Sequence, residues 1–245
     1  MEILFAASEL APTIKVGGLA DVVASLSKAL RLLGHKVTIA LPRYRALESS
    51  GLMLARRLTP LVLDGPGEPA QVTLYDGRLS SGVELLLLDI PGLYDRRGIY
   101  GEEGREYPDN ARRFGLFSRA VVEVVRQRAK MGTPFDILHA HDWPAAMTCY
   151  LLREQKPVPA TRSVLTLHNA AHQGLFPREA LATFGLGDEH FHPERLEFYG
   201  QLNFLKGGIL AADALTTVSD TYAREIQTPA QGFRLDGVIR SHARK

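Results

Sequence analysis

Two clusters of polar residues combine types and spacings that could do chemistry. The first is Lys15-Val16-Gly17-Gly18-Leu19, ahead of a helical pattern. Its two glycines would let backbone N–H groups approach a ligand closely. A helix N-terminus favours an anion, and Lys15 adds a positive charge. The segment therefore predicts a diphosphate site. The structural alternative is that the glycines only form a turn and that Lys15 is solvated. Asp21 complicates this interpretation, because its carboxylate could also accept a hydroxyl of a sugar.

The second cluster is rich in histidine and follows two predicted strands. It comprises His139-Ala140-His141-Asp142-Trp143, then His168-Asn169, then His172-Gln173-Gly174. Amides, carboxylates and an indole suit the hydroxyls and faces of a pyranose, so the cluster favours a sugar pocket. Zinc must also be considered, yet the spacing matches neither H-E-x-x-H nor H-x-H-x-D-H, and we expect no metal. A set of interior histidines packed on Trp143 is the purely structural alternative.

Several common nucleotide motifs are absent or out of context. Residues 65–70 fit G-x-G-x-x-A as letters, but their prolines and the lack of a following helix exclude a dinucleotide site. The chain contains no G-x-x-x-x-G-K-[ST]. It also contains no Asp-x-Asp pair. The last absence argues against an enzyme that holds a sugar diphosphate through a divalent cation.

The spacing of apolar residues predicts the elements that position these clusters. Ile3–Ala7 is an apolar strand, and the residues from Leu19 to Leu33 carry one apolar helix face that ends before Gly34. Val37–Leu41 is the next strand. Strand, helix and strand in about 40 residues form a βαβ unit, whose right-handed crossover makes the two strands parallel.

The same alternation continues along the chain. We expect further strands at Val83–Leu88, Ile137–His139, Ser163–Leu167 and Ala214–Val218. We expect helices at Asp109–Arg128, with Asp109 as N-cap, at Pro144–Arg153, and finally after Ser219 as N-cap. Residues 42–82 read as an insertion of short strands and loops. The sum is an α/β fold, a doubly wound, mostly parallel sheet with helices on both faces, which binds ligands beyond the carboxyl ends of its strands.

The composition fits an ordinary globular protein. The chain has 245 residues, 45% hydrophobic and 23% charged, with a formal net charge of +2. These values exclude a disordered chain and a strongly basic nucleic-acid binder. No apolar stretch approaches the ~18 residues of a membrane span, and the N-terminus reads as a strand rather than a signal peptide. A single cysteine, Cys149, favours a reducing compartment, so we expect a cytoplasmic protein in which this residue is packed.

Ordered short motifs resemble one known family, the bacterial glycogen synthases and plant starch synthases. The match begins at Ser8-Glu9 and the glycine segment through Val22, and runs to about residue 240. Its further motifs are Leu93-Tyr94-Asp95-Arg96, Asp109-Asn110, His139–Trp143, Thr166–Asn169, Gln173-Gly174, Phe204–Gly208 and Thr217–Ser219. Three positions depart from the family pattern: Val16 stands for the commoner Thr, Pro144 for a frequent His, and His172 for Tyr.

The resemblance implies a GT-B glycosyltransferase, built from two Rossmann-like domains that face each other across a cleft. Residues 1–245 would be the N-terminal, acceptor-side domain, and the C-terminal, nucleotide-binding domain would lie outside this chain. The family transfers glucose from ADP-glucose to the non-reducing end of an α-1,4-glucan, with retention and with no metal or cofactor. Because the absent domain would supply most charge stabilisation of the leaving diphosphate, we expect little turnover from this chain alone.

The resemblance also implies roles for individual residues. Lys15 would lie near the diphosphate, Gly17 and Gly18 would form its backbone cradle, and His168 would contact the transferred glucose. The acceptor and the reacting centre would be bordered by Asp21, Tyr94, Asp142 and Asn169. Glu9 and Gln173 would support this set.

Two other readings of the function stay open at this stage. The chain could be a stand-alone α-glucan-binding module that lacks catalysis. It could also belong to a GT-B transferase that uses UDP-glucose. The choice between ADP-glucose and UDP-glucose stays open because the base-binding residues would lie in the absent domain. The choice between a synthase domain and a binding module depends on whether a second α/β domain follows Lys245.

Overall fold

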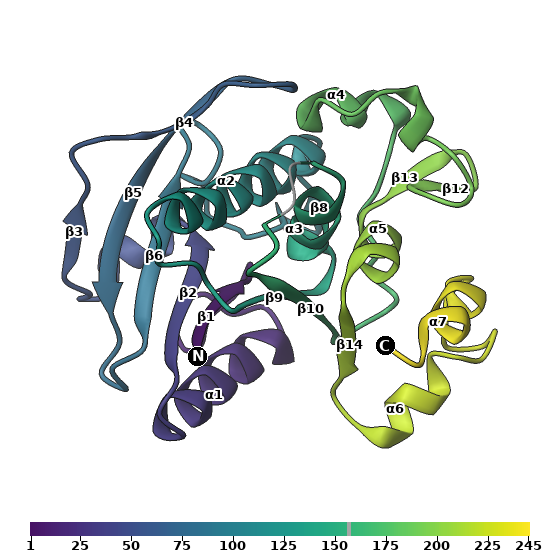
Figure 1. Ribbon diagram of the computed structural model, residues 1–245, viewed down its shortest axis with the longest axis horizontal. Coiled ribbons are helices and arrows are strands. Elements are labelled where there is room, and N and C mark those ends of the chain that lie inside the picture. Colours follow the sequence, from purple (N-terminus) through teal and green to yellow (C-terminus); the bar gives the residue numbers. More distant parts are fainter. Residues whose placement is uncertain (156–157) are drawn as a thin grey trace.

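The computed structural model describes residues 1–155 and 158–245, and a mixed nine-stranded sheet forms its centre (Figure 1). The strand order is β14-β10-β9-β1-β2-β6-β5-β3, with β4 also paired to β5. Every pairing from β14 to β6 is parallel, whereas β3, β4 and β5 pair antiparallel. The strands of this sheet are β1 (Glu2–Ala6), β2 (Lys36–Pro42), β3 (Leu54–Arg56), β4 (Leu61–Leu63), β5 (Ala70–Arg78), β6 (Glu84–Asp89), β9 (Ile137–His141), β10 (Arg162–Leu167) and β14 (Ala214–Thr217).

Helices cover both faces of the sheet, as the alternating pattern predicts. In Figure 1, α1 lies on one side of the parallel strands, and α2 and α3 lie on the other. The helices are α1 (Gly18–Leu32), α2 (Asn110–Lys130), α3 (Asp142–Glu154), α4 (Leu181–Phe184), α5 (Phe204–Ala211), α6 (Asp220–Glu225) and α7 (Asp236–His242). The predicted α/β class with a mostly parallel sheet is therefore confirmed.

The first βαβ unit forms as its apolar spacing predicts. β1 and β2 are parallel, with Ile3 paired to Val37 and Ala6 to Ala40. Gly34 follows the end of α1 with φ +88°, a left-handed conformation that glycine adopts without steric strain. This unit places the loop between β1 and α1 at the carboxyl edge of the sheet.

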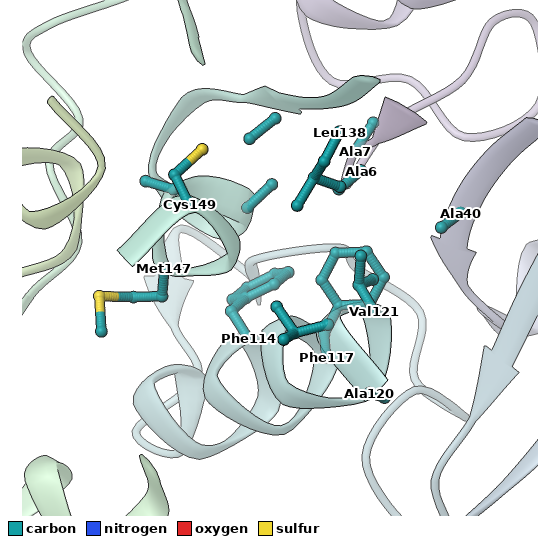
Figure 2. Packing of buried hydrophobic residues seen from close by; sticks show 14 of the residues in the cluster. Ala6, Ala7, Ala40, Phe114, Phe117, Ala120, Val121, Leu138, Met147 and Cys149 are labelled. Atoms are coloured by element: carbon teal, nitrogen blue, oxygen red, sulfur yellow. The ribbon is translucent and has the colours of Figure 1, made fainter. Parts of the chain in front are cut away.

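The core lies between the sheet and the long helix α2. Figure 2 shows Phe114, Phe117 and Val121 of α2 facing Leu138 of β9 and Ala6 of β1. Every residue of α2 from Arg113 to Val122 is buried, because α3, α4 and β4 also pack against this helix.

Cys149 of α3 is buried in the same core, as the sequence predicts (Figure 2). Burial raises the pKa of its thiol to about 12, so it stays protonated and unreactive in the folded protein.

Three predictions about element ends are wrong in detail. β9 continues through His141, because both histidines fit buried positions on the strand. Asp109 stands at the N-cap position of α2, but its carboxylate accepts Arg96 at 2.6–2.7 Å rather than a helix N–H. Ser219 does cap α6, accepting the N–H of Tyr222 at 3.1 Å, yet α7 follows, so α6 is not the final helix.

Two small sheets are separate from the central sheet. One contains β11 (Leu175–Phe176), β12 (Glu197–Phe198) and β13 (Gln201–Asn203), and the other is a hairpin of β7 (Gly101–Glu102) and β8 (Arg105–Glu106). The hairpin forms one wall of the site described below.

In the described ranges 1–155 and 158–245, no helix combines the length and the apolar character that a membrane crossing requires.

Candidate active site

A cleft of about 960 Å³ opens at the carboxyl ends of β1, β9, β10 and β14. Segments far apart in the sequence meet there, because parallel strands end at the same edge. The loop before α1 forms one side, the β7–β8 hairpin a second, and the residues after β9, β10 and β14 a third. The lining residues are Glu9, Val16–Leu19, Val22, Gly98–Glu106, Trp143, His168, Asn169, His172 and Val218.

Glu9 holds the glycine loop in place. Its side chain is only 4% exposed, and its Oε2 accepts the N–H groups of Val16 at 2.7 Å and Gly17 at 2.9 Å. Its Oε1 accepts the hydroxyl of Tyr100 at 2.7 Å. Because that hydroxyl has one proton, the contact between Ser8 Oγ and Tyr100 at 2.7 Å must be donated by Ser8. The N–H of Gly17, which the expected diphosphate cradle would use, is thus bound to a carboxylate of the chain itself.

Gly17 and Gly18 leave open space in the cleft. A methyl group at either position would meet no atom within 4 Å, and neither residue has a left-handed φ. The fold itself therefore does not require glycine at these positions. No side chain in the described part of the chain caps α1, whose first N–H groups point to the same space. An anionic or hydroxyl-bearing ligand could use them.

Lys15 and Asp21 bind each other at the rim. Their charged groups are 2.8 Å apart, and both side chains are about half exposed. The residues between them line the cleft, but these two side chains do not. Because Asp21 partly neutralises the charge of Lys15, the electrostatic attraction between Lys15 and a diphosphate would be weaker.

Asp142 anchors the loop that carries His168. It is the first residue of α3, only 7% exposed, with φ +54°, and its Oδ1 accepts the N–H of His168 at 2.7 Å. A longer contact of 3.4 Å reaches the N–H of Asn169. Burial raises the pKa of this carboxyl to about 7, even though both hydrogen bonds favour the ionised form. Asp142 lies beneath the lining and positions it.

His168 is half-buried and faces the cleft. Its Nε2 lies 3.0 Å from Nδ1 of His141. Burial lowers the pKa of His168 to about 4, so its imidazole is neutral at pH 7. A neutral imidazole can form a hydrogen bond with a sugar oxygen, but it supplies no charge to a diphosphate.

Two of the residues expected at the site lie elsewhere. Tyr94 is fully buried, and its hydroxyl donates to the carbonyl of Arg113 at 2.8 Å. Gln173 is buried, donates to the carbonyls of Ala170 and Phe233, and accepts Asn203 at 2.7 Å. Their polar atoms already have partners within the chain, so both side chains support the walls and do not line the cleft.

Trp143 lines the cleft but exposes only 8% of its surface. It is buried and packs against Phe114 in a T-shaped contact with ring centroids 4.9 Å apart. Gly174 has φ +63° and leaves the space this indole occupies, since a methyl group there would lie 2.5 Å from it. The broad stacking platform expected for a sugar is therefore not available.

The sequence interpretation missed the hairpin wall of the cleft. Its glycines signal it: a methyl group on Gly98 would lie 1.8 Å from the carbonyl oxygen of Gly101, so the turn closes only with glycine. The wall is held from below, where Asn110 donates to the carbonyl of Tyr100 at 2.8 Å and Arg113 to that of Ile99 at 2.8 Å. It brings the carboxylates of Glu102, Glu103 and Glu106 to the cleft.

The histidines do not converge on a common point. His139 Nε2 contacts Thr166 Oγ1 at 2.6 Å, and His141 contacts His168. The rings of His139 and His141 stack with their centroids 4.3 Å apart. Within residues 1–155 and 158–245, no group of three or more histidine, cysteine or acidic side chains is arranged to hold a metal ion.

Fold and site together define a class: a Rossmann-like α/β domain whose ligand cleft lies between a glycine loop and histidine-bearing strand ends. Comparison with known proteins gives the family. Residues 2–241 match the protein family described as "Starch synthase catalytic domain", and the chain belongs to that glycosyltransferase family.

Individual relatives agree with this assignment. The chain is 42% identical to the glycogen synthase of Geotalea uraniireducens over 245 residues, which is 98% of this chain and 49% of that protein. It is 45% identical to the glycogen synthase of Thioalkalivibrio sulfidiphilus over 248 residues, covering 99% and 50%. The solved catalytic domain of starch synthase IV from Arabidopsis thaliana, bound to ADP and acarbose, superposes with a TM-score of 0.89 at 31% identity, covering 100% of this chain and 50% of that one. The chain thus spans about half the length of the curated relatives it matches.

Proposed function

We propose that residues 1–245 form the acceptor-side domain of a retaining glucosyltransferase, which moves glucose from ADP-glucose to the non-reducing end of an α-1,4-glucan. The observation that carries this proposal is the shared cleft, which both the open glycine loop and His168 line. Membership of the starch synthase family supports the reaction type. ADP as the nucleotide is supported by the related starch synthase IV, which was solved with ADP and acarbose.

The lining of the cleft suits neutral carbohydrate. The carboxylates of Glu102, Glu103 and Glu106 can accept sugar hydroxyls, and the neutral imidazole of His168 can bind a sugar oxygen. Glu9 and Asp142 have a different role. They fix the glycine loop and the start of the loop that carries His168, through their hydrogen bonds to backbone N–H groups.

The charge of the cleft implies that a second domain takes part. Among the lining residues that the structure describes, Arg105 is the one with a permanent positive charge, against four carboxylates. Lys15 at the rim is paired with Asp21. Stabilising the charge of a departing diphosphate is usually the largest contribution to such catalysis. We therefore propose that a C-terminal nucleotide-binding domain supplies the missing cations, and that this chain alone has little turnover.

Transfer of labelled glucose to maltoheptaose tests the proposal. The 245-residue chain should give no incorporation above background, whereas the chain joined after Lys245 to the second half of the Geotalea uraniireducens synthase should incorporate glucose from ADP-glucose. Fast turnover by the chain alone would contradict the need for a second domain. Faster transfer from UDP-glucose than from ADP-glucose would contradict the proposed donor.

Binding measurements on the chain alone separate the sugar site from catalysis. Calorimetric titration with maltoheptaose should give binding that His168→Ala weakens. His35→Ala, a change far from the cleft at the start of β2, serves as the matched control. No binding of maltoheptaose, or equal binding by His168→Ala, would show that this cleft is not the glucan site.

A further inference from the structure

A buried histidine lies directly behind the one that faces the cleft. His141, on β9, has no exposed surface, and its Nδ1 lies 3.0 Å from Nε2 of His168. Its ring is enclosed by apolar and stacked neighbours, with Phe5 at 4.8 Å and His139 at 4.3 Å between ring centroids. The sequence interpretation gave His141 no role of its own.

One proton must lie between the two facing nitrogens. Either His141 Nδ1–H donates to a bare Nε2 of His168, or His168 Nε2–H donates to a bare Nδ1 of His141. The other nitrogen of His141 decides between these arrangements. His141 Nε2 is buried and has no hydrogen-bond partner among the described residues.

The second arrangement would place an N–H on that buried, unpartnered atom. A buried N–H without an acceptor is strongly unfavourable and rare in native proteins. The first arrangement leaves only an unused lone pair there. His141 is therefore protonated on Nδ1 and donates to His168.

The donor behind His168 then fixes the tautomer of the residue in front. With Nε2 accepting from His141, the neutral ring of His168 must hold its proton on Nδ1. Asp142 fixes the backbone of His168 at the same time, because its Oδ1 accepts that N–H at 2.7 Å. His141 thus fixes the tautomer of the His168 ring, and Asp142 fixes the backbone of the same residue.

We propose that His141 is a positioning residue, which holds His168 as the Nδ1–H tautomer so that His168 presents an N–H donor to an oxygen of the bound sugar. The identity of the sugar ligand rests on the proposed function. The tautomer does not, since it follows from the contacts within the chain. The site therefore selects ligands with an acceptor oxygen at this position.

Nitrogen-15 NMR of the histidine rings of the 245-residue chain tests the tautomer directly. In the unmodified chain His168 should show a protonated Nδ1 and an unprotonated Nε2. The reverse assignment would overturn the proposal by itself, with no variant needed.

Matched variants test the role of His141. His141→Phe removes the donor and keeps a ring, so His168 should change to the Nε2–H form that free histidine favours. His141→Asn places an amide N–H near the former Nδ1 and should keep the original tautomer. His139→Phe is the control, because His139 is on the same strand and face but contacts Thr166. Loss of the Nδ1–H form in the control as well would show a general packing effect and refute a specific role.

Maltoheptaose binding links the tautomer to the ligand. His141→Phe should weaken binding about fivefold to tenfold, which corresponds to the loss of one neutral hydrogen bond. His141→Asn and His139→Phe should bind within about twofold of the unmodified chain. If the unmodified chain shows the expected tautomer but binds no maltoheptaose, the proposed function fails while the tautomer assignment stands. Equal binding by His141→Phe, with its tautomer changed, would refute the link to the ligand.

Discussion

Replacing Asp142 by Asn should stabilise the protein at pH 8, although the residue supports the site. The carboxyl is buried, and burial raises its pKa from 3.8 to about 7. The folded state therefore binds this proton more tightly than the unfolded state, so stability falls as the pH rises from about 4 to 7. Above pH 7 the raised pKa corresponds to a penalty of about 4 kcal/mol.

The size of the expected change follows from this penalty. At pH 5 the group is already ionised in the unfolded chain but protonated in the folded one, and about 2 kcal/mol of the penalty applies. Asparagine carries no charge and accepts the N–H of His168 through Oδ1, as the protonated carboxyl does, and the raised pKa already includes the stronger bonds to the carboxylate. Asp142→Asn should therefore be about 4 kcal/mol more stable than the unmodified chain at pH 8, and about 2 kcal/mol more stable at pH 5.

Urea unfolding at pH 5 and pH 8, followed by far-ultraviolet circular dichroism, measures both values. Asp21→Asn is the control, because Asp21 is half exposed and its pairing with Lys15 contributes at most about 1 kcal/mol. A gain that does not depend on pH, or an Asp142→Asn variant that is less stable at pH 8, would show that the buried charge is not the cause. In the two-domain enzyme the same substitution should still slow glucose transfer, because it loosens the His168 loop.

Three further predictions concern the cleft and the core. Gly18→Ala should leave the stability unchanged or raise it by up to about 1 kcal/mol in urea unfolding, because alanine favours the helix. The same change should weaken maltoheptaose binding in calorimetry, because the added methyl group fills open space in the cleft. Arg113→Met should destabilise the protein by about 3 kcal/mol in urea unfolding, since it removes bonds to the carbonyls of Leu93 and Ile99 and to Asn110. Cys149 should react with a disulfide reagent only in denaturant, because burial raises the pKa of its thiol to about 12. The release of the reagent's coloured thiolate measures this reaction.

Each of these expectations has a contrary result. Lost stability in Gly18→Ala would mean that the fold requires the glycine. An unchanged unfolding midpoint in Arg113→Met would mean that the hairpin wall holds without this guanidinium. Fast labelling of Cys149 in buffer would show that the helix carrying it opens readily.

The sequence predicts the parallel part of the fold well, for a clear physical reason. Buried parallel strands are near-continuous apolar runs, and the amphipathic helices between them have a regular period. Strand ends are harder to predict. His139 and His141 look polar, but their neutral rings fit buried positions in β9 when each finds a hydrogen-bond partner.

The site could be predicted only in part. The glycine loop and His168 do share one cleft, as their positions after parallel strands indicate. Tyr94 and Gln173 instead bind partners within the chain, and sequence spacing contains no information about such long-range contacts. The β7–β8 hairpin was missed because its apolar content is low, and its glycines only become informative once their close backbone contacts are known.

Glu9 has a consequence for the way a ligand enters. Because its carboxylate already binds the N–H groups of Val16 and Gly17, contacts within the chain are enough to order the loop. The entropy of ordering that loop is therefore lost during folding rather than on binding, which strengthens the association that follows. The same fixed negative charge repels a phosphate from the start of the loop and directs it toward Gly18 and the first turn of α1.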